Sequence, residues 1–198
     1  LEAVAYTNTH IYHVTHDAGG SENCMGMPGA YGVMGLVLDG KNYFRNNLKT
    51  VSQLSGISES EIVSSPEKNI LAYASAYSSV LSQLKAGTEI ERQITTMISL
   101  SELPEGSLQG DYALNAHLYS VLNFMNSAEQ ASTFNFSQHN IDLVAVFGEE
   151  NLKVLSSSHV TISSEKIIDN NGNTFKDGEL PSTTSADYLQ TQRNYFST

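Results

Sequence analysis

The chain has 198 residues, with 21 acidic and 10 basic side chains and a formal net charge of −11. This length is enough for one good-sized domain with a real hydrophobic core. The charge argues against binding to nucleic acid or to an anionic membrane surface, because both depend on lysine and arginine. No apolar run reaches the ~18 residues that predict a transmembrane segment, and a single cysteine excludes an intramolecular disulfide framework.

Only 16% of the residues are charged, and serine, threonine and asparagine supply much of the remaining polarity. We interpret this low-charge, acidic composition as favouring an exported protein, either secreted, periplasmic or at the cell surface.

Residues 1–16 combine β-branched and aromatic residues, which pack well on a pleated sheet. Val4, Tyr6, Tyr12 and Val14 alternate onto one face of such a strand. The pattern predicts an extended N-terminal arm. Three fates are open to it: closure onto its own sheet, addition to an open sheet edge of another copy, or disorder.

Three of the six histidines follow the spacing H-x-x-H-x-x-H at His10, His13 and His16, and the only cysteine is Cys24. On a helix, neighbouring histidines of this series would share a face and could hold zinc, copper or haem together with Cys24. On a strand, His13 would face away, and His10 and His16 would lie about 20 Å apart. The strand reading therefore leaves three half-exposed polar residues, while the helix reading predicts a metal site.

Cys24 lies in a glycine-rich stretch, residues 17–30. A lone cysteine can be a nucleophile with a distant histidine as base, which would make the protein a cysteine hydrolase. It can equally be a small buried hydrophobic residue, and this is the reading we favour. The apolar residues 31–38 that follow predict one buried strand, closed by a turn at Asp39-Gly40.

A helix is expected from Leu48 to Leu54, ended by Gly56. Residues 54–62 resemble the helix-turn-helix pattern of DNA-binding repressors. The would-be recognition helix carries Glu59 and Glu61, which would repel phosphates. We therefore interpret this stretch as an ordinary helical corner.

The centre of the chain predicts a helical hairpin. Ser65 and Pro66 are typical of a helix start, Gly87 ends the first helix, and Thr88 with Glu91 forms a capping box for the second, which Pro104 stops. The apolar stripe expected to face the core in the first helix consists of Ile70, Leu71, Ala74, Tyr77, Leu81 and Leu84.

Residues 114–125 predict a third strong helix, followed by a polar loop over residues 126–138. Residues 141–147 fit a buried strand or a helical turn, and residues 149–155 a short helix.

The tail carries β signals. Residues 159–163 alternate, and Asn171-Gly172 predicts a β-hairpin. Asp169 would also start a calcium-binding loop, but Thr174 stands where that loop needs glycine. Near the C-terminus, residues 188–196 suggest one more short helix.

Together these patterns predict a single helix-rich α+β domain over residues 1–198, with a small sheet built from N-terminal strands and a C-terminal β-hairpin. No motif of a known enzyme class is present in the sequence. The leading functional hypothesis is a non-enzymatic, exported interaction or structural subunit. Its partner would be a protein, including copies of itself assembled through the N-terminal strand. The alternatives are a metal or haem binder at His10, His13, His16 and Cys24, and a cysteine hydrolase.

Overall fold

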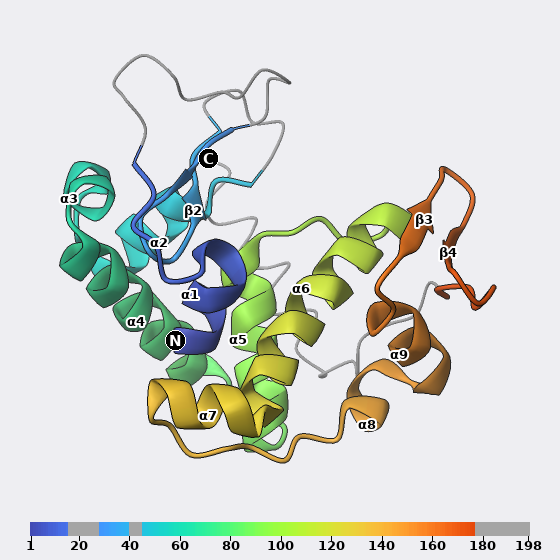
Figure 1. Cartoon of the computed structure of the whole chain (residues 1–198). Coiled ribbons are helices and arrows are strands. Elements are labelled where there is room, and N and C mark those ends of the chain that lie inside the picture. The colour runs from blue at the N-terminus through green and yellow to red at the C-terminus, as the bar shows by residue number, and fades with distance from the viewer. Residues whose placement is uncertain (16–27, 40–44, 177–198) are drawn as a thin grey trace. The chain divides into compact units, whose positions relative to one another are not determined.

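Figure 1 shows a computed structural model that describes residues 1–15, 28–39 and 45–176. The chain divides into two compact units, Leu1–Glu102 and Leu103–Thr198, and each is described by itself. The helix-rich α+β class is confirmed, with nine helices and two antiparallel two-stranded sheets in the described ranges. The N-terminal strands and the C-terminal hairpin form separate sheets rather than one. The single-domain organisation stays a prediction.

The first unit contains α1 (Glu2–Thr9), β1 (Ala30–Tyr31), β2 (Leu36–Val37), α2 (Asn47–Ser55), α3 (Glu59–Ser64), α4 (Pro66–Gln83) and α5 (Glu89–Ser101). The second contains α6 (Leu108–Asn126), α7 (Ala128–Phe134), α8 (Leu143–Phe147), α9 (Glu149–Leu155), β3 (Val160–Ile162) and β4 (Ile167–Asp169).

The prediction of a β-strand over residues 1–16 is wrong, because its first half is the helix α1. Ala3, Val4 and Ala5 are buried on one side of this helix. The hydroxyl of Thr9, at the last position of the helix, donates outside it, to the carbonyl of Val33 at 2.6 Å. Burial and a hydrogen bond to a distant segment therefore outweigh the local preference of these β-branched residues for a strand.

The predicted strand over residues 31–38 is a tight antiparallel hairpin instead. Tyr31 pairs with Leu36, and Ala30 pairs with Val37. Gly32 and Gly35 have φ values of 71° and 61°, which reverse the chain where a continuous strand was expected. The expected burial is confirmed, since Met34 and Leu36 are almost completely buried.

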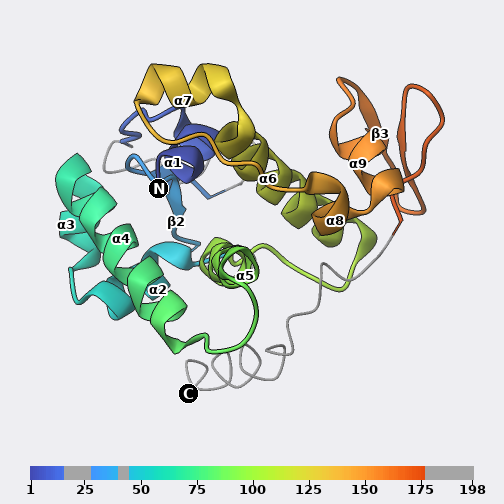
Figure 2. The same ribbon diagram turned by 90° about the horizontal axis from the view of Figure 1, so that it is seen from below.

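The helical hairpin α4–α5 is confirmed, as are the capping box at Thr88 and the helix start at Ser65 and Pro66. Figure 2 shows α2 and α3 beside α4, and all three are in contact. The predicted core stripe of α4 is confirmed only at Leu84, which is buried, and the rest of it faces the wrong side of the helix. Ile70 and Leu71 are 40% and 48% exposed, and the helix buries Asn69, Ala72, Tyr73, Ala76 and Val80 instead.

In the second unit, α6 confirms the third helix and α9 the short helix, while residues 143–147 form a helical turn, α8. The predicted loop over residues 126–138 is wrong in its first half, which is the helix α7. Ser127 caps α7 by accepting from the amide of Gln130. Phe134 and Phe136 both pack against Phe124 of α6, with ring centroids 5.5 Å apart in each case. Packing of these aromatic rings outweighs the polar composition of the segment.

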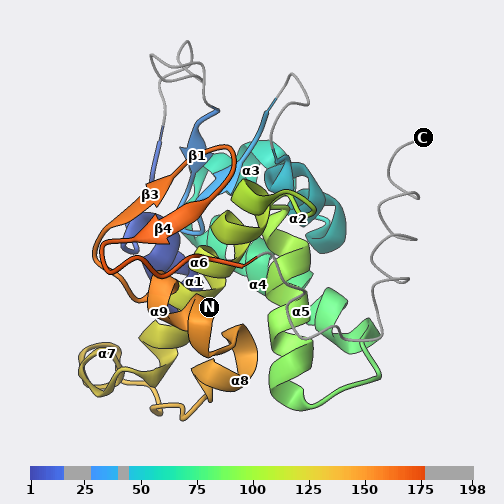
Figure 3. The same cartoon turned by 90° about the vertical axis from the view of Figure 1, so that its right-hand side faces the viewer.

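Figure 3 shows β3 and β4 as one hairpin in which Val160 pairs with Asp169. The turn predicted at Asn171-Gly172 is confirmed, because the chain folds back to place Thr174 against Ile168. The carboxylate of Asp169 accepts hydrogen bonds from the amides of this turn at 2.7–2.9 Å. The Asp169 carboxylate therefore stabilises this turn through the hydrogen bonds that it accepts. The helix predicted at residues 188–196 lies outside the described residues.

Candidate functional site

The most unusual backbone of the first unit lies directly after α1. His10 and Ile11 have φ values of 52° and 63°, so two consecutive non-glycine residues are left-handed. The helix ends here with two backbone hydrogen bonds. The amide of His10 donates to the carbonyl of Tyr6 at 2.9 Å, and the amide of Ile11 donates to the carbonyl of Ala5 at 3.2 Å. A left-handed conformation costs an L-residue roughly 1–2 kcal/mol, and a β-branched residue adopts it least readily. Strain of this kind concentrates at functional sites.

This turn exposes an apolar and an aromatic side chain side by side in the sequence. Ile11 is 36% exposed and Tyr12 is 71% exposed. The amide of Tyr12 donates to the carbonyl of Thr9 at 3.0 Å, so the backbone that carries both residues is bonded back to the helix. We call Ile11 and Tyr12 the tip.

Three amide and hydroxyl side chains, two half-buried and one fully buried, hold the β1–β2 hairpin. Asn8 donates to the carbonyl of Met34 at 2.9 Å, and Thr9 donates to that of Val33 at 2.6 Å. From the other side, the fully buried Asn69 of α4 accepts the amide of Met34 at 2.7 Å. We call Asn8, Thr9 and Asn69 the clamp. It fixes the turn of the hairpin to both α1 and α4.

The clamp explains why this hairpin needs glycines. A Cβ on Gly32 would lie 2.0 Å from Nδ2 of Asn69, and one on Gly35 would lie 2.8 Å from Cβ of Asn8. Both positions also have left-handed φ angles. Glycine is therefore required twice over, for space and for conformation.

The opposite end of the hairpin is held by the N-terminal end of α2. Asn47 accepts the amide of Val37 at 2.7 Å and donates to the carbonyl of Leu100 at 3.0 Å. Arg45 donates to the carbonyl of Ser101 at 3.3 Å. Burial lowers the pKa of the Arg45 guanidinium, and the nearby Glu102 carboxylate partly offsets this effect. These contacts are structural, because they satisfy the last carbonyls of α5.

His13 lies between the tip and Val14. Val14 pairs with the hairpin, because the amide of Gly32 donates to the carbonyl of Val14 at 2.8 Å. Both ring nitrogens of His13 are buried, and neither has a hydrogen-bond partner among the residues that the structure describes. An unsatisfied buried polar atom costs about 1–3 kcal/mol. Such an atom in a native structure calls for an explanation, for example an ion, a water molecule or a functional role.

Of the residues of the predicted metal site, the structure describes His10 and His13, and neither lies in a helix or a strand. His10 ends α1, with its ring edge-on to Tyr6 at 4.9 Å, so it lies on neither a helical face nor a strand. His13 comes after the left-handed turn, and the predicted shared helical face of His10 and His13 is therefore wrong. His16 and Cys24 lie outside the described residues, so the full metal site and the hydrolase hypothesis stay predictions. Within the described ranges no group of three or more His, Cys, Asp or Glu side chains could hold a metal ion.

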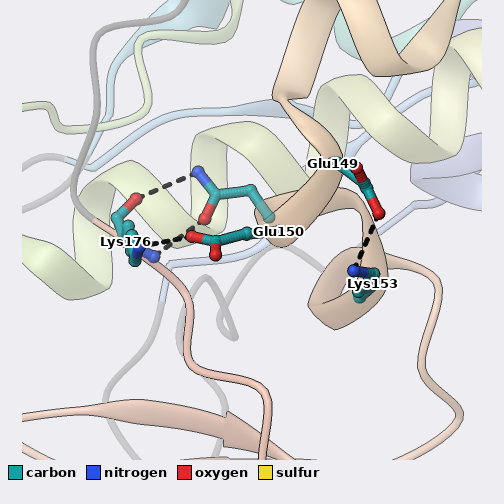
Figure 4. Close-up of polar contacts among 5 residues, drawn as sticks. Glu149, Glu150, Lys153 and Lys176 are labelled. Atoms are coloured by element: carbon teal, nitrogen blue, oxygen red, sulfur yellow. Dashed lines mark hydrogen bonds and ion pairs between the residues drawn. The ribbon is translucent and has the colours of Figure 1, made fainter.

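The second unit contributes ion pairs on its surface (Figure 4). Lys153 contacts Glu149 at 2.9 Å, and Lys176 contacts Glu150. Asn151 donates to the carbonyl of Lys176 at 3.0 Å and accepts its amide at 2.8 Å. Exposed ion pairs contribute about 0–1 kcal/mol. This cluster fastens residue 176 to α9.

No protein family, curated protein or solved structure was found to match this chain. No helix among the described residues is long and apolar enough to cross a membrane. What the fold and the site define is a helix-rich α+β protein with a strained, clamped tip on its first unit.

Proposed function

We propose that this chain is a non-enzymatic, exported interaction subunit that binds a partner protein through the tip. The observation that carries the proposal is the exposure of Ile11 and Tyr12 on a backbone with two consecutive left-handed residues. Tyrosine is enriched at the energetic centres of protein interfaces. An apolar neighbour on a fixed backbone adds contact area with little loss of conformational entropy on binding.

The clamp supports the same proposal. Asn8 and Thr9 of the clamp hold the chain before the tip, and the Val14–Gly32 pairing holds it after the tip. The strain is thus maintained by folding and does not have to be generated on binding. Residues 2–9 are not available as a strand for exchange between copies, because they form the helix α1, in which Ala3, Val4 and Ala5 are buried.

Site-specific photocrosslinking tests this proposal in the producing cells. Tyr12 is replaced by a photoreactive phenylalanine analogue, with the 50%-exposed Val144 as the control position. We expect defined covalent protein adducts from position 12 and none from position 144. Tyr12→Ala should keep the melting temperature but abolish function of the complex so identified. Equal, diffuse labelling from both positions would contradict the proposal.

Metal binding is the second candidate function, and the unpartnered ring nitrogens of His13 favour it. Imidazole nitrogens are common zinc and copper ligands. Elemental analysis of protein purified without chelator should then show near-stoichiometric metal that His13→Ala removes. The exposed His139 offers the matched control, since His139→Ala should leave the metal content unchanged. Metal-free protein, together with unchanged or increased stability in His13→Leu, would contradict metal binding.

A further inference from the structure

The turn that follows β4 in Figure 3 carries three asparagines, and the structure places them in different surroundings. The side chain of Asn170 accepts a hydrogen bond from the hydroxyl of Ser157 at 3.0 Å. The side chain of Asn173 donates to the carboxylate of Asp169 at 2.7 Å. Asn171 lies between them, is exposed, and has no hydrogen-bond partner for its side chain within the described ranges. Asn171 is therefore the asparagine of this turn whose side chain no other group restrains.

The residue after Asn171 is Gly172, and this is the only Asn-Gly pair in the 198-residue sequence. Gly172 is exposed, and a Cβ at this position would meet nothing within 4 Å. Without a side chain, glycine shields its own backbone nitrogen less than any other residue does. The amide of Gly172 donates to the carbonyl of Asp169 at 3.2 Å, at the long end of the range for such bonds. A local opening of this exposed turn therefore frees that nitrogen beside the side chain of Asn171.

We propose that Asn171 is a site of spontaneous deamidation, with the backbone nitrogen of Gly172 as the nucleophile. The nitrogen loses its proton to hydroxide and attacks Cγ of Asn171, which closes a five-membered succinimide ring. The bond from Cγ to Nδ2 breaks, and Nδ2 takes a proton from water and leaves as ammonia. Water then opens the ring at one of its two carbonyls, which gives aspartate or isoaspartate. The reaction consumes one water, releases one ammonia and needs no oxidant or reductant.

Either product places a new carboxylate close to that of Asp169. In the folded turn, the Asp169 carboxylate accepts the amide of Asn171 at 2.9 Å and the amide of Asn173 at 2.8 Å. A second negative charge on the neighbouring residue of the same turn disfavours the charged form of Asp169. Deamidation therefore weakens the electrostatic basis of the turn.

Isoaspartate also changes the length of the main chain, because the backbone then runs through Cβ and Cγ of residue 171 and gains one carbon atom. The chain that returns from the turn is held in register, since Thr174 pairs with Ile168 and the amide of Phe175 donates to the carbonyl of Ile167 at 2.9 Å. Phe175 is only 2% exposed, and its ring packs edge-on against Tyr112 at 5.3 Å. An extra atom in so tight a turn shifts this register and loosens Phe175.

Ageing of the full chain at mildly alkaline pH, followed by peptide mapping in a mass spectrometer, tests the site. We expect Asn171 to gain one mass unit at least about ten-fold faster than Asn170 or Asn173, because only Asn171 combines an unrestrained side chain with a following glycine. The rate should rise about ten-fold for each pH unit, as the ionised fraction of a weak acid does below its pKa. An isoaspartyl methyltransferase should label the product.

Two variants separate the site from its neighbours. Asn171→Gln should abolish the mass gain, because glutamine would have to close a six-membered ring, whereas Asn170→Gln should leave the gain at Asn171 unchanged. If the folded chain gained no mass at Asn171 under conditions in which the free peptide of residues 167–176 does, the fold would protect this turn and the proposal would be overturned. Equal modification of all three asparagines would overturn it as well.

Hydrogen exchange of the purified isoaspartate form tests the structural consequence. The amide of Phe175 should exchange about ten-fold faster than in the unmodified chain, as expected for the loss of one hydrogen bond. The amide of the buried Val121 in α6 should exchange at its original rate. Enzymatic conversion of isoaspartate to aspartate should restore most of the protection of Phe175. Unchanged exchange at Phe175 in the isoaspartate form would refute the shift in register.

Discussion

Asn69 gives the sharpest test of how the hairpin is held. Its Oδ1 accepts the buried amide of Met34 at 2.7 Å, and its Nδ2 donates to the carbonyl of Ile62 at 3.2 Å. Asn69→Ala leaves one buried donor and one buried acceptor without partners. At about 1–3 kcal/mol for each unsatisfied group, the hairpin loses roughly 3 kcal/mol. This loss equals about a hundred-fold change in its opening equilibrium.

Hydrogen exchange followed by NMR measures this opening at the Met34 amide itself. We expect that amide to exchange about a hundred times faster in Asn69→Ala than in the parent chain. Gln53→Ala removes an exposed amide side chain from α2 in the same unit and should change the rate less than about two-fold. If Asn69→Ala altered the exchange no more than the control does, the clamp would not be what holds the hairpin.

Three further outcomes are expected. Gly32→Ala should unfold the hairpin or lower the free energy of unfolding by more than about 2 kcal/mol in urea titrations, because its Cβ collides with Asn69 at a left-handed φ. Ile11→Gly should raise that free energy by about 1 kcal/mol, since glycine adopts positive φ without strain; a loss would show that the apolar contacts of Ile11 outweigh its strain. Hydrogen bonds from the side chain of Asn173, and then from turn amides, lower the pKa of Asp169. The turn should therefore be fully stabilised above the unfolded pKa of about 3.9 and lose that contribution as the pH falls through the lower folded value, which NMR shifts of the Asn173 amide would report.

Helix starts with a local capping signal were the most predictable part of this chain. The capping box at Thr88 needs only a glutamate three residues later, and the start at Ser65 and Pro66 is equally local. The same holds for the turn at Asn171-Gly172. Such signals depend only on neighbouring residues, so they predict the local structure without knowledge of the tertiary contacts.

The side of each element that faces the core was harder to predict. In α4, apolar residues cover both faces, and the inner face is marked by the polar Asn69, so hydrophobicity alone selected the wrong stripe. In α1, tertiary burial of Ala3, Val4 and Ala5 outweighed a local preference for strand.

The candidate site could be located from the sequence but not built. The density of histidines around residue 10 drew attention to the segment that carries the tip, while the clamp joins residues 26 and 35 positions apart, Asn8 to Met34 and Met34 to Asn69. The available signal was Asn69 directly before the apolar residues 70–72, because a buried asparagine must find partners.

The central claim is that the tip is formed in the free protein. NMR of the isolated chain measures it directly, because a positive φ brings the amide and Hα protons of one residue close together and gives a strong nuclear Overhauser effect between them. Strong effects of this kind at His10 and Ile11, with Val14 paired to Gly32, are the predicted result. Weak intraresidue effects at His10 and Ile11, without contacts between Val14 and Gly32, would contradict it.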